Sequence, residues 1–277
     1  MRTALVLPGC GARMIVQAGM VNAFVMRGEK YDGLFATSAG SLVGAMLHGH
    51  DVPGLIDLVT KIRSKDVYRL AAPWSIWSRS ASLFDTAPLQ KLIAAYIDCS
   101  AIRLNPTPFR FNVTNLSDGA GEMLEASKLT DVDMRRALLT SASVPALFPL
   151  QWQYSAIGDG QAAYCDGGLA NDYCVEEAWL SGYDRIVVMA AMVPEPAKVR
   201  NVIDALTQTI SVAINCQLKK EVDAARKGGA QVILVEPPEP TGIGIIDFDY
   251  KRDRKELMQI GYRAAMKALD DAEKPAA

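Results

Sequence analysis

The chain has 277 residues, of which 50% are hydrophobic and 22% are charged, with a formal net charge of −2. This length favours one α/β domain whose core is large enough to need neither disulfides nor a structural metal. The near-neutral charge excludes the strongly basic class of nucleic-acid-binding proteins. Only 2 histidines are present, so any mechanism that requires a histidine base must take it from His48 or His50.

Short apolar segments alternate with amphipathic segments along the chain. This alternation predicts a mainly parallel sheet covered by helices on both faces, which is a three-layer α/β/α fold. The predicted strands are residues 3–7, 31–36, 108–114, 123–126, 163–165, 185–191 and 231–235. The predicted helices are residues 13–27, 38–48, 52–62, 85–97, 132–140, 171–180, 202–226 and 251–269. The best linker candidate, residues 237–244, isolates only a C-terminal helix, so we expect a single domain over residues 1–277.

A glycine-containing loop follows the first predicted strand and opens the first helix. Small residues at Gly9 and Gly11 allow backbone N–H groups to approach an oxygen ligand closely, as an oxyanion hole or a phosphate cradle requires. Met14 occupies the place of the third glycine of a dinucleotide fingerprint, and no G-K-[ST] follows, which excludes dinucleotide and P-loop sites. Arg13 fits either this loop or an ordinary ion pair at the start of the helix.

Ser38 lies where the second predicted strand turns directly into a helix, between Ala36 and Gly40. Small residues on both sides permit a tight strand–helix elbow that exposes the hydroxyl at the helix N-terminus, where the helix dipole favours negative charge. The usual elbow is G-x-S-x-G, and Ala36 stands in its first glycine position. An ordinary serine N-cap fits the same pentapeptide.

The histidines restrict which group could act as a base for Ser38. His48 is about ten residues, or roughly 15 Å, further along the same helix, and His50 is further still. A Ser-His-Asp triad is therefore excluded, and a nucleophilic Ser38 requires a carboxylate or a lysine as its base. Asp166 follows a short predicted strand, where functional groups of an open parallel sheet collect, although Asp-Gly is also a common turn.

These three loops, taken in this order, resemble the patatin-like phospholipase family, whose members carry a G-G-G-x-R/K loop, a G-x-S-x-G elbow and a D-G-G/A aspartate. Three further segments resemble family patterns, namely residues 17–20 (QAGM), 83–89 (LFDTAPL) and 141–149 (SASVPALFP). The resemblance covers about residues 3–191 and leaves the C-terminal helices, at about residues 200–270, outside it. It implies a patatin-like fold and an acyl hydrolase of phospholipids or lysophospholipids that works through a Ser–Asp dyad and an acyl-enzyme, without a cofactor.

Carried over residue by residue, the resemblance makes Ser38 the nucleophile and Asp166 the general base. The residues that it implies for the oxyanion hole are Gly9, Cys10, Gly11 and Arg13, with Arg13 positioning the loop. The residues that we expect either to line an acyl pocket or to pack in the core are Val144, Leu147 and Phe148. A general carboxylesterase or acyltransferase with the same dyad, and a catalytically weak lipid-binding scaffold, are the alternatives.

Three residues depart from the family pattern, and each departure carries a physical expectation. Cys10 replaces a glycine, and its Cβ costs strain if the φ angle is positive there. Met14 replaces the glycine after Arg13, and we expect it to narrow the acyl entrance. Ala36 adds one methyl group to the elbow. These changes leave the dyad intact and favour a slow or specialised enzyme.

The remaining features concern membranes and location. Residues 61–79 combine five lysines and arginines with Trp74 and Trp77, a composition typical of docking on anionic lipid. A solvated helix end followed by a packed loop is the alternative. The longest uncharged stretch, residues 137–158, contains serines, prolines and glutamines, which predicts a buried loop region rather than a transmembrane helix. With 5 cysteines and no C-x-x-C pair, we expect a cytoplasmic protein with reduced thiols that touches membranes transiently and binds no nucleic acid.

Overall fold

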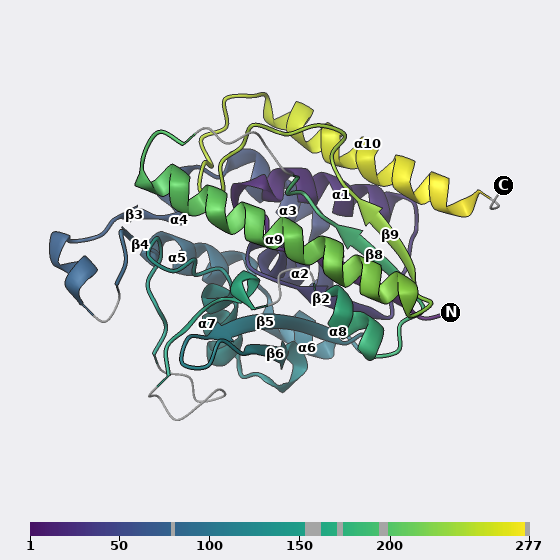
Figure 1. Ribbon diagram of the computed structural model, residues 1–277, viewed down its shortest axis with the longest axis horizontal. Helices are drawn as coiled ribbons and strands as arrows, with labels where there is room; N and C mark the ends of the chain where they lie inside the picture. Colours follow the sequence, from purple (N-terminus) through teal and green to yellow (C-terminus); the bar gives the residue numbers. More distant parts are fainter. Residues whose placement is uncertain (79–80, 153–161, 171–173, 194–198, 275–277) are drawn as a thin grey trace.

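The computed structural model describes residues 1–78, 81–152, 162–170, 174–193 and 199–274 and has one large sheet at its centre (Figure 1). The sheet order is β6-β5-β2-β1-β8-β9, and β7 pairs with β5. Its strands are β1 (Thr3–Leu7), β2 (Gly33–Ala36), β5 (Phe109–Asn115), β6 (Gly121–Glu125), β7 (Tyr164–Asp166), β8 (Arg185–Met189) and β9 (Gln231–Val235). A separate two-stranded sheet joins β3 (Arg69–Leu70) to β4 (Phe84–Asp85).

Ten α-helices are found in the described part of the chain. They are α1 (Met14–Met26), α2 (Ala39–His48), α3 (Val52–Lys61), α4 (Ser64–Val67), α5 (Ala87–Tyr96), α6 (Cys99–Leu104), α7 (Asp131–Ser141), α8 (Val175–Leu180), α9 (Val202–Lys227) and α10 (Arg254–Glu273). Short 3-10 turns lie at Gly11–Arg13, Pro73–Trp77, Ala126–Lys128 and Gly167–Leu169. None of the helices described here is both long enough and apolar enough to cross a membrane.

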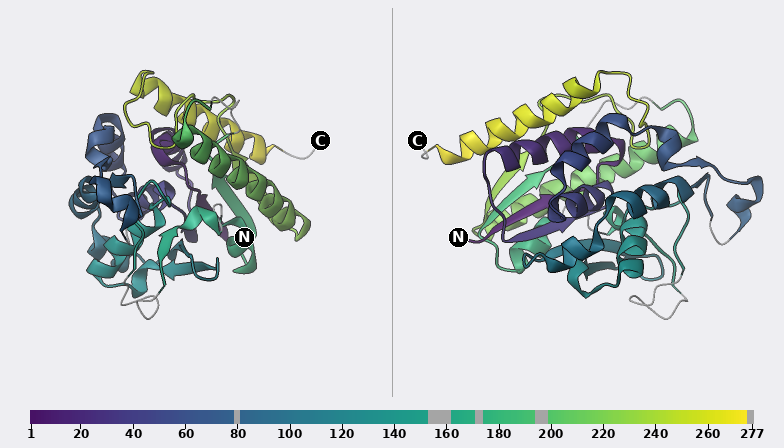
Figure 2. Two further views of the ribbon diagram at one scale, coloured as in Figure 1. Left: turned by 60° about the vertical axis from the view of Figure 1, so that its left-hand side comes forward. Right: turned by 180° about the vertical axis from the view of Figure 1, so that it is seen from behind.

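The sheet is buried on both faces, and β1 shows how the sequence achieves this. Ala4 and Val6 pack on one side with apolar residues of α8 and α9, while Leu5 and Leu7 pack on the other side with those of α1, α2 and α10. Figure 2 shows α9 and the helices from the first half of the chain on opposite sides of the sheet. Because every residue of β1 is buried, the strand is a continuous apolar run rather than an alternating one. The expected three-layer α/β/α fold is confirmed.

Strand directions agree with a mainly parallel sheet, with two exceptions. The pairs of β1 with β2 and β8, of β2 with β5, and of β8 with β9 are all parallel. Both β6 and β7 pair with β5 in the antiparallel sense. β6 follows β5 directly in the chain. β7 comes much later in the chain and pairs with the C-terminal half of β5. The sequence pattern does not encode the antiparallel direction of β7.

The sequence pattern missed the short elements between α3 and β5, namely α4, α6, β3 and β4. α6 is short and depends on its cap, because the Asp98 carboxylate accepts hydrogen bonds from the Ser100 and Ala101 amides. β3 and β4 have two residues each, too few for an alternation to be visible. The helix predicted over residues 171–180 is α8, which begins at Val175. Residues 171–173, and residues 153–161 of the long uncharged stretch, lie outside the described part.

Candidate active site

Ser38 occupies a strained turn between β2 and α2. Its backbone has φ 53° and ψ −132°, a conformation that residues with a side chain rarely adopt. Its side chain makes no capping hydrogen bond to the helix. Instead, the Ser38 hydroxyl donates a 2.6 Å hydrogen bond to the Asp166 carboxylate, although the two residues are 128 positions apart in the sequence. Ser38 therefore occupies the N-cap position of α2 without capping the helix through its side chain, and the turn has the geometry of a nucleophile elbow.

The small residues on either side of Ser38 have separate structural roles. Gly40 lies against the end of β1, where a Cβ would come within 2.2 Å of the Leu7 carbonyl oxygen and 2.4 Å of that of Pro8. Glycine is thus required for α2 to start so close to β1. Ala36 is fully buried in β2, and its methyl group belongs to the apolar core on the α1 side of the sheet. The elbow accommodates the alanine that stands in its first glycine position.

The strand register explains how Asp166 reaches Ser38. Ala36 pairs with Phe111, so Ser38 and Val113 are each two residues beyond that pair. Val113 pairs in turn with Asp166 at the end of the antiparallel strand β7. Asp166 therefore lies beside Ser38 at the carboxyl ends of the parallel strands β2 and β5. We expected Asp166 to reach this end of the sheet on a parallel strand. That detail was wrong, because β7 runs antiparallel to β5.

Asp166 is buried and holds two hydrogen bonds through its two carboxylate oxygens. Oδ2 accepts the Ser38 hydroxyl, and Oδ1 accepts the Gly168 amide at 2.8 Å. Asp166 therefore forms the turn expected of an Asp-Gly pair and also contacts Ser38, and its role as a general base stays a prediction. Burial raises the pKa of Asp166 from 3.8 to about 7, against the lowering effect of the two hydrogen bonds.

A polar brace fixes the distance between the two loops. The Thr37 hydroxyl donates to the Asn112 side-chain oxygen at 2.6 Å, and the Asn112 amide donates to the Gly167 carbonyl at 3.0 Å. Asn112 thus connects the residue before Ser38 to the residue after Asp166. No sequence motif marks it, since β5 also carries other polar residues, Arg110, Thr114 and Asn115.

The segment at residues 141–149 contacts both loops, as its resemblance to a family pattern near the site implies. The Ser38 amide donates to the Ser141 hydroxyl at 2.9 Å, and the Asp166 amide donates to the Ser143 carbonyl at 2.9 Å. These contacts hold the backbones on both sides of the Ser38–Asp166 pair. Ser141 and Ser143 are therefore positioning residues that we did not single out individually from the sequence.

The glycine loop lies beside the same serine. Cys10 has φ −142°, so its Cβ causes no backbone strain, and the left-handed conformation falls on Gly11 with φ +53°. A Cβ on Gly11 would also come within 2.2 Å of the Ile245 carbonyl oxygen. Gly9, Cys10 and Gly11 line a pocket together with Ser38 and Asp166. Arg13 is buried at the end of this loop, and its amide donates to the Cys10 carbonyl.

Two apolar pockets meet at Ser38. The larger runs between α2, α3 and α5, and the smaller lies on the Asp166 side. Val144 lines both pockets, and Phe148 lines the larger. Met14 also lines the larger pocket. Leu147 is fully buried in a cluster with Phe84, Val144 and Phe148 and is not among the described lining residues, so it packs in the core behind the pocket wall.

His48 lies at the far end of α2 and contributes nothing to this site. Its ring packs near those of Tyr31 and Phe109. Burial, together with the charge of nearby His50, lowers the His48 pKa to about 4, so the ring is neutral at physiological pH. Among the described residues, no group of three or more histidine, cysteine, aspartate and glutamate side chains could hold a metal ion.

The chain is similar to known proteins in both sequence and fold. A model of the patatin-like phospholipase family matches residues 5–179. The chain belongs to this family. Among solved structures, the patatin-like fold seen here is similar to that of VipD from Legionella pneumophila, with a TM-score of 0.52 and 14% sequence identity over 98% of this chain and 67% of VipD. No curated protein matches the chain. Membership of the patatin-like family supports lipid acyl hydrolase activity in general.

The pKa of Asp166 predicts how any activity that uses it as a base depends on pH. Because the base must be ionised, kcat/KM should rise with pH along an acidic limb with an apparent pKa of about 7. Because this pKa lies above the ordinary value of 3.8, the folded state binds the proton more tightly, so stability should fall as pH rises between these two values. A pH–rate profile with an uncharged ester tests the first point. A profile without an acidic limb near neutrality would contradict it.

The close approach of Gly40 to β1 predicts a position-specific cost for a single methyl group. Gly40→Ala should lower the free energy of unfolding by about 3 kcal/mol, because backbone atoms must move to admit the Cβ. Gly44→Ala is the matched control in the same helix, since a Cβ there meets only apolar side-chain carbons at 3.4 Å. The control should be neutral or stabilising by up to about 1 kcal/mol. Urea unfolding of both variants measures the difference, and equal midpoints would refute this account of the elbow.

Proposed function

We propose that the protein is a serine acyl hydrolase that cleaves fatty-acyl esters of phospholipids or lysophospholipids through Ser38 and Asp166. The observation that carries this proposal is the 2.6 Å hydrogen bond from the Ser38 hydroxyl to a buried carboxylate at the junction of two apolar pockets. An exposed serine would serve many functions, but a serine paired with a buried base beside apolar space is suited to an apolar ester.

In the first half of the reaction, the Asp166 carboxylate takes the proton of Ser38 as Oγ attacks the ester carbonyl carbon. Negative charge moves to the carbonyl oxygen, which faces the backbone of Gly9, Cys10 and Gly11. The C–O bond then breaks, and protonated Asp166 returns the proton to the departing alcohol oxygen. The products of this half are the free alcohol and an acyl group esterified to Ser38.

In the second half, Asp166 takes a proton from water as the water oxygen attacks the acyl carbon. Ser38 leaves and recovers that proton, and the fatty acid is released. The Gly168 amide holds the second oxygen of Asp166 throughout, which keeps Oδ2 directed at the reacting oxygens. A base pKa near 7 suits both proton transfers at neutral pH.

The larger pocket is the compartment that we assign to the acyl chain. It begins at Ser38, Gly11 and Ala39 and continues along apolar side chains of α3 and α5. Its lining is almost entirely apolar, as a pocket for an acyl chain requires. The smaller pocket on the Asp166 side then receives the leaving alcohol, because it is the one that Asp166 lines.

Replacing either member of the pair tests the chemistry directly. Ser38→Ala and Asp166→Asn should each lower kcat for fatty-acid release by about a thousandfold or more, because nucleophile and base act as a unit. Fatty-acid release is measured on mixed phospholipid and lysophospholipid micelles, and hydrolysis of a short p-nitrophenyl ester is followed in parallel. Two exposed residues supply matched controls, Ser100→Ala on α6 and Asp223→Asn on α9, and both should keep full activity.

The outcomes separate the proposal from its alternatives. Unchanged release in Ser38→Ala would remove Ser38 as the nucleophile. A fluorophosphonate adduct on Ser38 that is lost in Asp166→Asn would support a base-activated serine. Ester cleavage restricted to the p-nitrophenyl substrate would favour a general carboxylesterase over a phospholipase. Lipid binding without hydrolysis of any ester would favour the scaffold.

The assignment of the acyl pocket predicts a change in chain-length preference. Leu92 lies on α5 and lines the larger pocket, so Leu92→Trp should fill part of the space that a long chain needs. Hydrolysis of a long-chain p-nitrophenyl ester should fall by about tenfold relative to the butyrate ester. Leu124→Trp, at a half-buried position on β6 away from both pockets, is the control. An equal effect on short and long esters would place the acyl chain elsewhere.

A further inference from the structure

A projecting segment carries four large apolar side chains that no part of the described fold covers. We name the described residues 69–78 and 81–85 the tryptophan lobe. It projects at the left of Figure 1 and at the right of the right-hand view in Figure 2. The exposed fractions of its apolar side chains are 81% for Leu70, 73% for Trp74, 52% for Ile76 and 89% for Trp77. Single exposed apolar residues are ordinary, but four within eight positions of one projection indicate an interaction surface.

The lobe displays these side chains on an ordered backbone. Arg69 pairs with Asp85 and Leu70 with Phe84 in the small β3–β4 sheet, and the Ala71 amide donates to the Leu83 carbonyl. The Ser75 hydroxyl donates to the Ser82 carbonyl across the lobe. An apolar surface that is already ordered loses little conformational entropy when it binds, which favours binding.

Basic residues surround the base of the lobe. Lys61, Arg63, Lys65 and Arg69 are all exposed in this stretch. Lys61 forms an ion pair with Asp57 and Arg69 forms one with Asp85, and Asp66 is the third acid of the stretch. The fifth basic residue of this stretch, Arg79, lies outside the described residues. Tryptophan is the residue most suited to the boundary between hydrocarbon and headgroups, and lysine and arginine bind anionic headgroups. Tryptophan beside lysine and arginine is the combination expected of a surface that binds anionic lipid.

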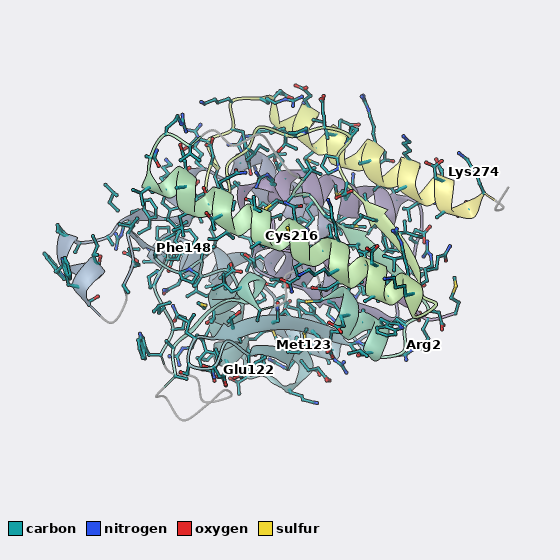
Figure 3. All side chains as sticks on the ribbon, viewed as in Figure 1. Arg2, Glu122, Met123, Phe148, Cys216 and Lys274 are labelled. Atoms are coloured by element: carbon teal, nitrogen blue, oxygen red, sulfur yellow. The ribbon has the colours of Figure 1, made fainter. Side chains whose placement is uncertain are left out.

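The lobe also adjoins the wall of the larger pocket. The centroid of the Tyr68 ring lies 4.6 Å from that of the Phe84 ring and 5.9 Å from that of the Phe148 ring. Phe148 lines the larger pocket. Figure 3 places Phe148 toward the end of the molecule from which the lobe projects. The Leu83 amide donates to the Ala146 carbonyl and the Phe84 amide to that of Leu147, so the lobe is hydrogen-bonded to the segment that holds Ser38 and Asp166.

We propose that the tryptophan lobe inserts its apolar side chains into the interface of an anionic membrane and thereby brings the larger pocket to the lipid surface. Leu70, Trp74, Ile76 and Trp77 enter the boundary between headgroups and acyl chains, while the basic residues at the lobe base contact lipid phosphates. The lobe serves membrane attachment and makes no contact with the reacting atoms. The delivery of an ester to Ser38 rests on the proposed function, whereas the attachment does not.

Vesicle binding tests the attachment independently of catalysis. The full chain with Ser38→Ala is sedimented with vesicles of phosphatidylcholine alone and of phosphatidylcholine mixed with phosphatidylglycerol. It should bind the anionic vesicles more tightly, and added Trp74→Ser and Trp77→Ser should weaken this binding by about tenfold or more. Leu104→Ser is the matched control, since Leu104 is 84% exposed on α6, away from the lobe. It should leave binding unchanged.

Brominated phosphatidylcholine and activity measurements complete the test. Bromine quenches tryptophan fluorescence at short range, so quenching should occur in the parent chain and be largely lost in the double serine variant. With Ser38 restored, the double variant should keep its rate on a short ester in solution and lose about tenfold on vesicles. Absence of vesicle binding, equal binding to the two vesicle types, or equal binding by the double variant would each overturn the proposal. Vesicle binding through the lobe without any hydrolysis would leave it standing and refute the proposed function instead.

Discussion

The hydrogen bond between Ser38 and Asp166 is the constraint on which the rest of the site depends. It joins two loops that are 128 residues apart, and both partners are buried. The strained backbone of Ser38 costs on the order of 1–3 kcal/mol, and a hydrogen bond to a charged group contributes a similar amount. The bond alone therefore does not secure the turn. The surrounding contacts must do so, and the Thr37–Asn112–Gly167 brace and the Ser141 hydroxyl are the visible ones.

Burial of Asp166 sets its strength as a base. An aspartate in water is too weak a base to deprotonate a serine hydroxyl efficiently at neutral pH, and removing it from water raises its pKa toward that of histidine. The chain places its one buried histidine, His48, at the other end of α2 in an aromatic environment that keeps it neutral. In the proposed mechanism, a desolvated carboxylate takes the role that imidazole has in the common serine hydrolases.

The sequence predicted what depends on local pattern and missed what depends on pairing between distant segments. The apolar runs of β1 and β9 matched the predicted bounds, since both strands are short buried runs ended by turn residues. The antiparallel direction of β7 was missed, because direction is fixed by which neighbour a strand joins. The placement of Asp166 beside Ser38 was nevertheless expected, because both candidate loops had been assigned to one edge of the sheet.

The roles of individual side chains likewise divide into those that the sequence predicts and those that only the fold decides. That Cys10 is unstrained could not be read from its identity, since the left-handed conformation falls one residue later, on Gly11. Leu147 and Phe148 are adjacent apolar residues in the same segment, and only the fold decides that one faces the core and the other the pocket. Asn112 carries no motif, because its role as a brace exists only when β5 pairs with both β2 and β7.

The C-terminal part of the chain, beyond the family match at residues 5–179, completes the site. From the sequence, the residues after the linker candidate at 237–244 were expected to form only a C-terminal helix. In the fold, the Ala12 amide donates to the Ile245 carbonyl at 2.7 Å, and the Tyr250 hydroxyl donates to the Ala12 carbonyl at 2.6 Å. Ile245 also lines both pockets. The proposed oxyanion role requires the glycine loop to hold one backbone conformation. The loop cannot secure that conformation itself, because glycine has the most conformational freedom to lose. The segment around Ile245 and Tyr250 supplies that restraint, so the glycine loop and the C-terminal segment form one structural unit.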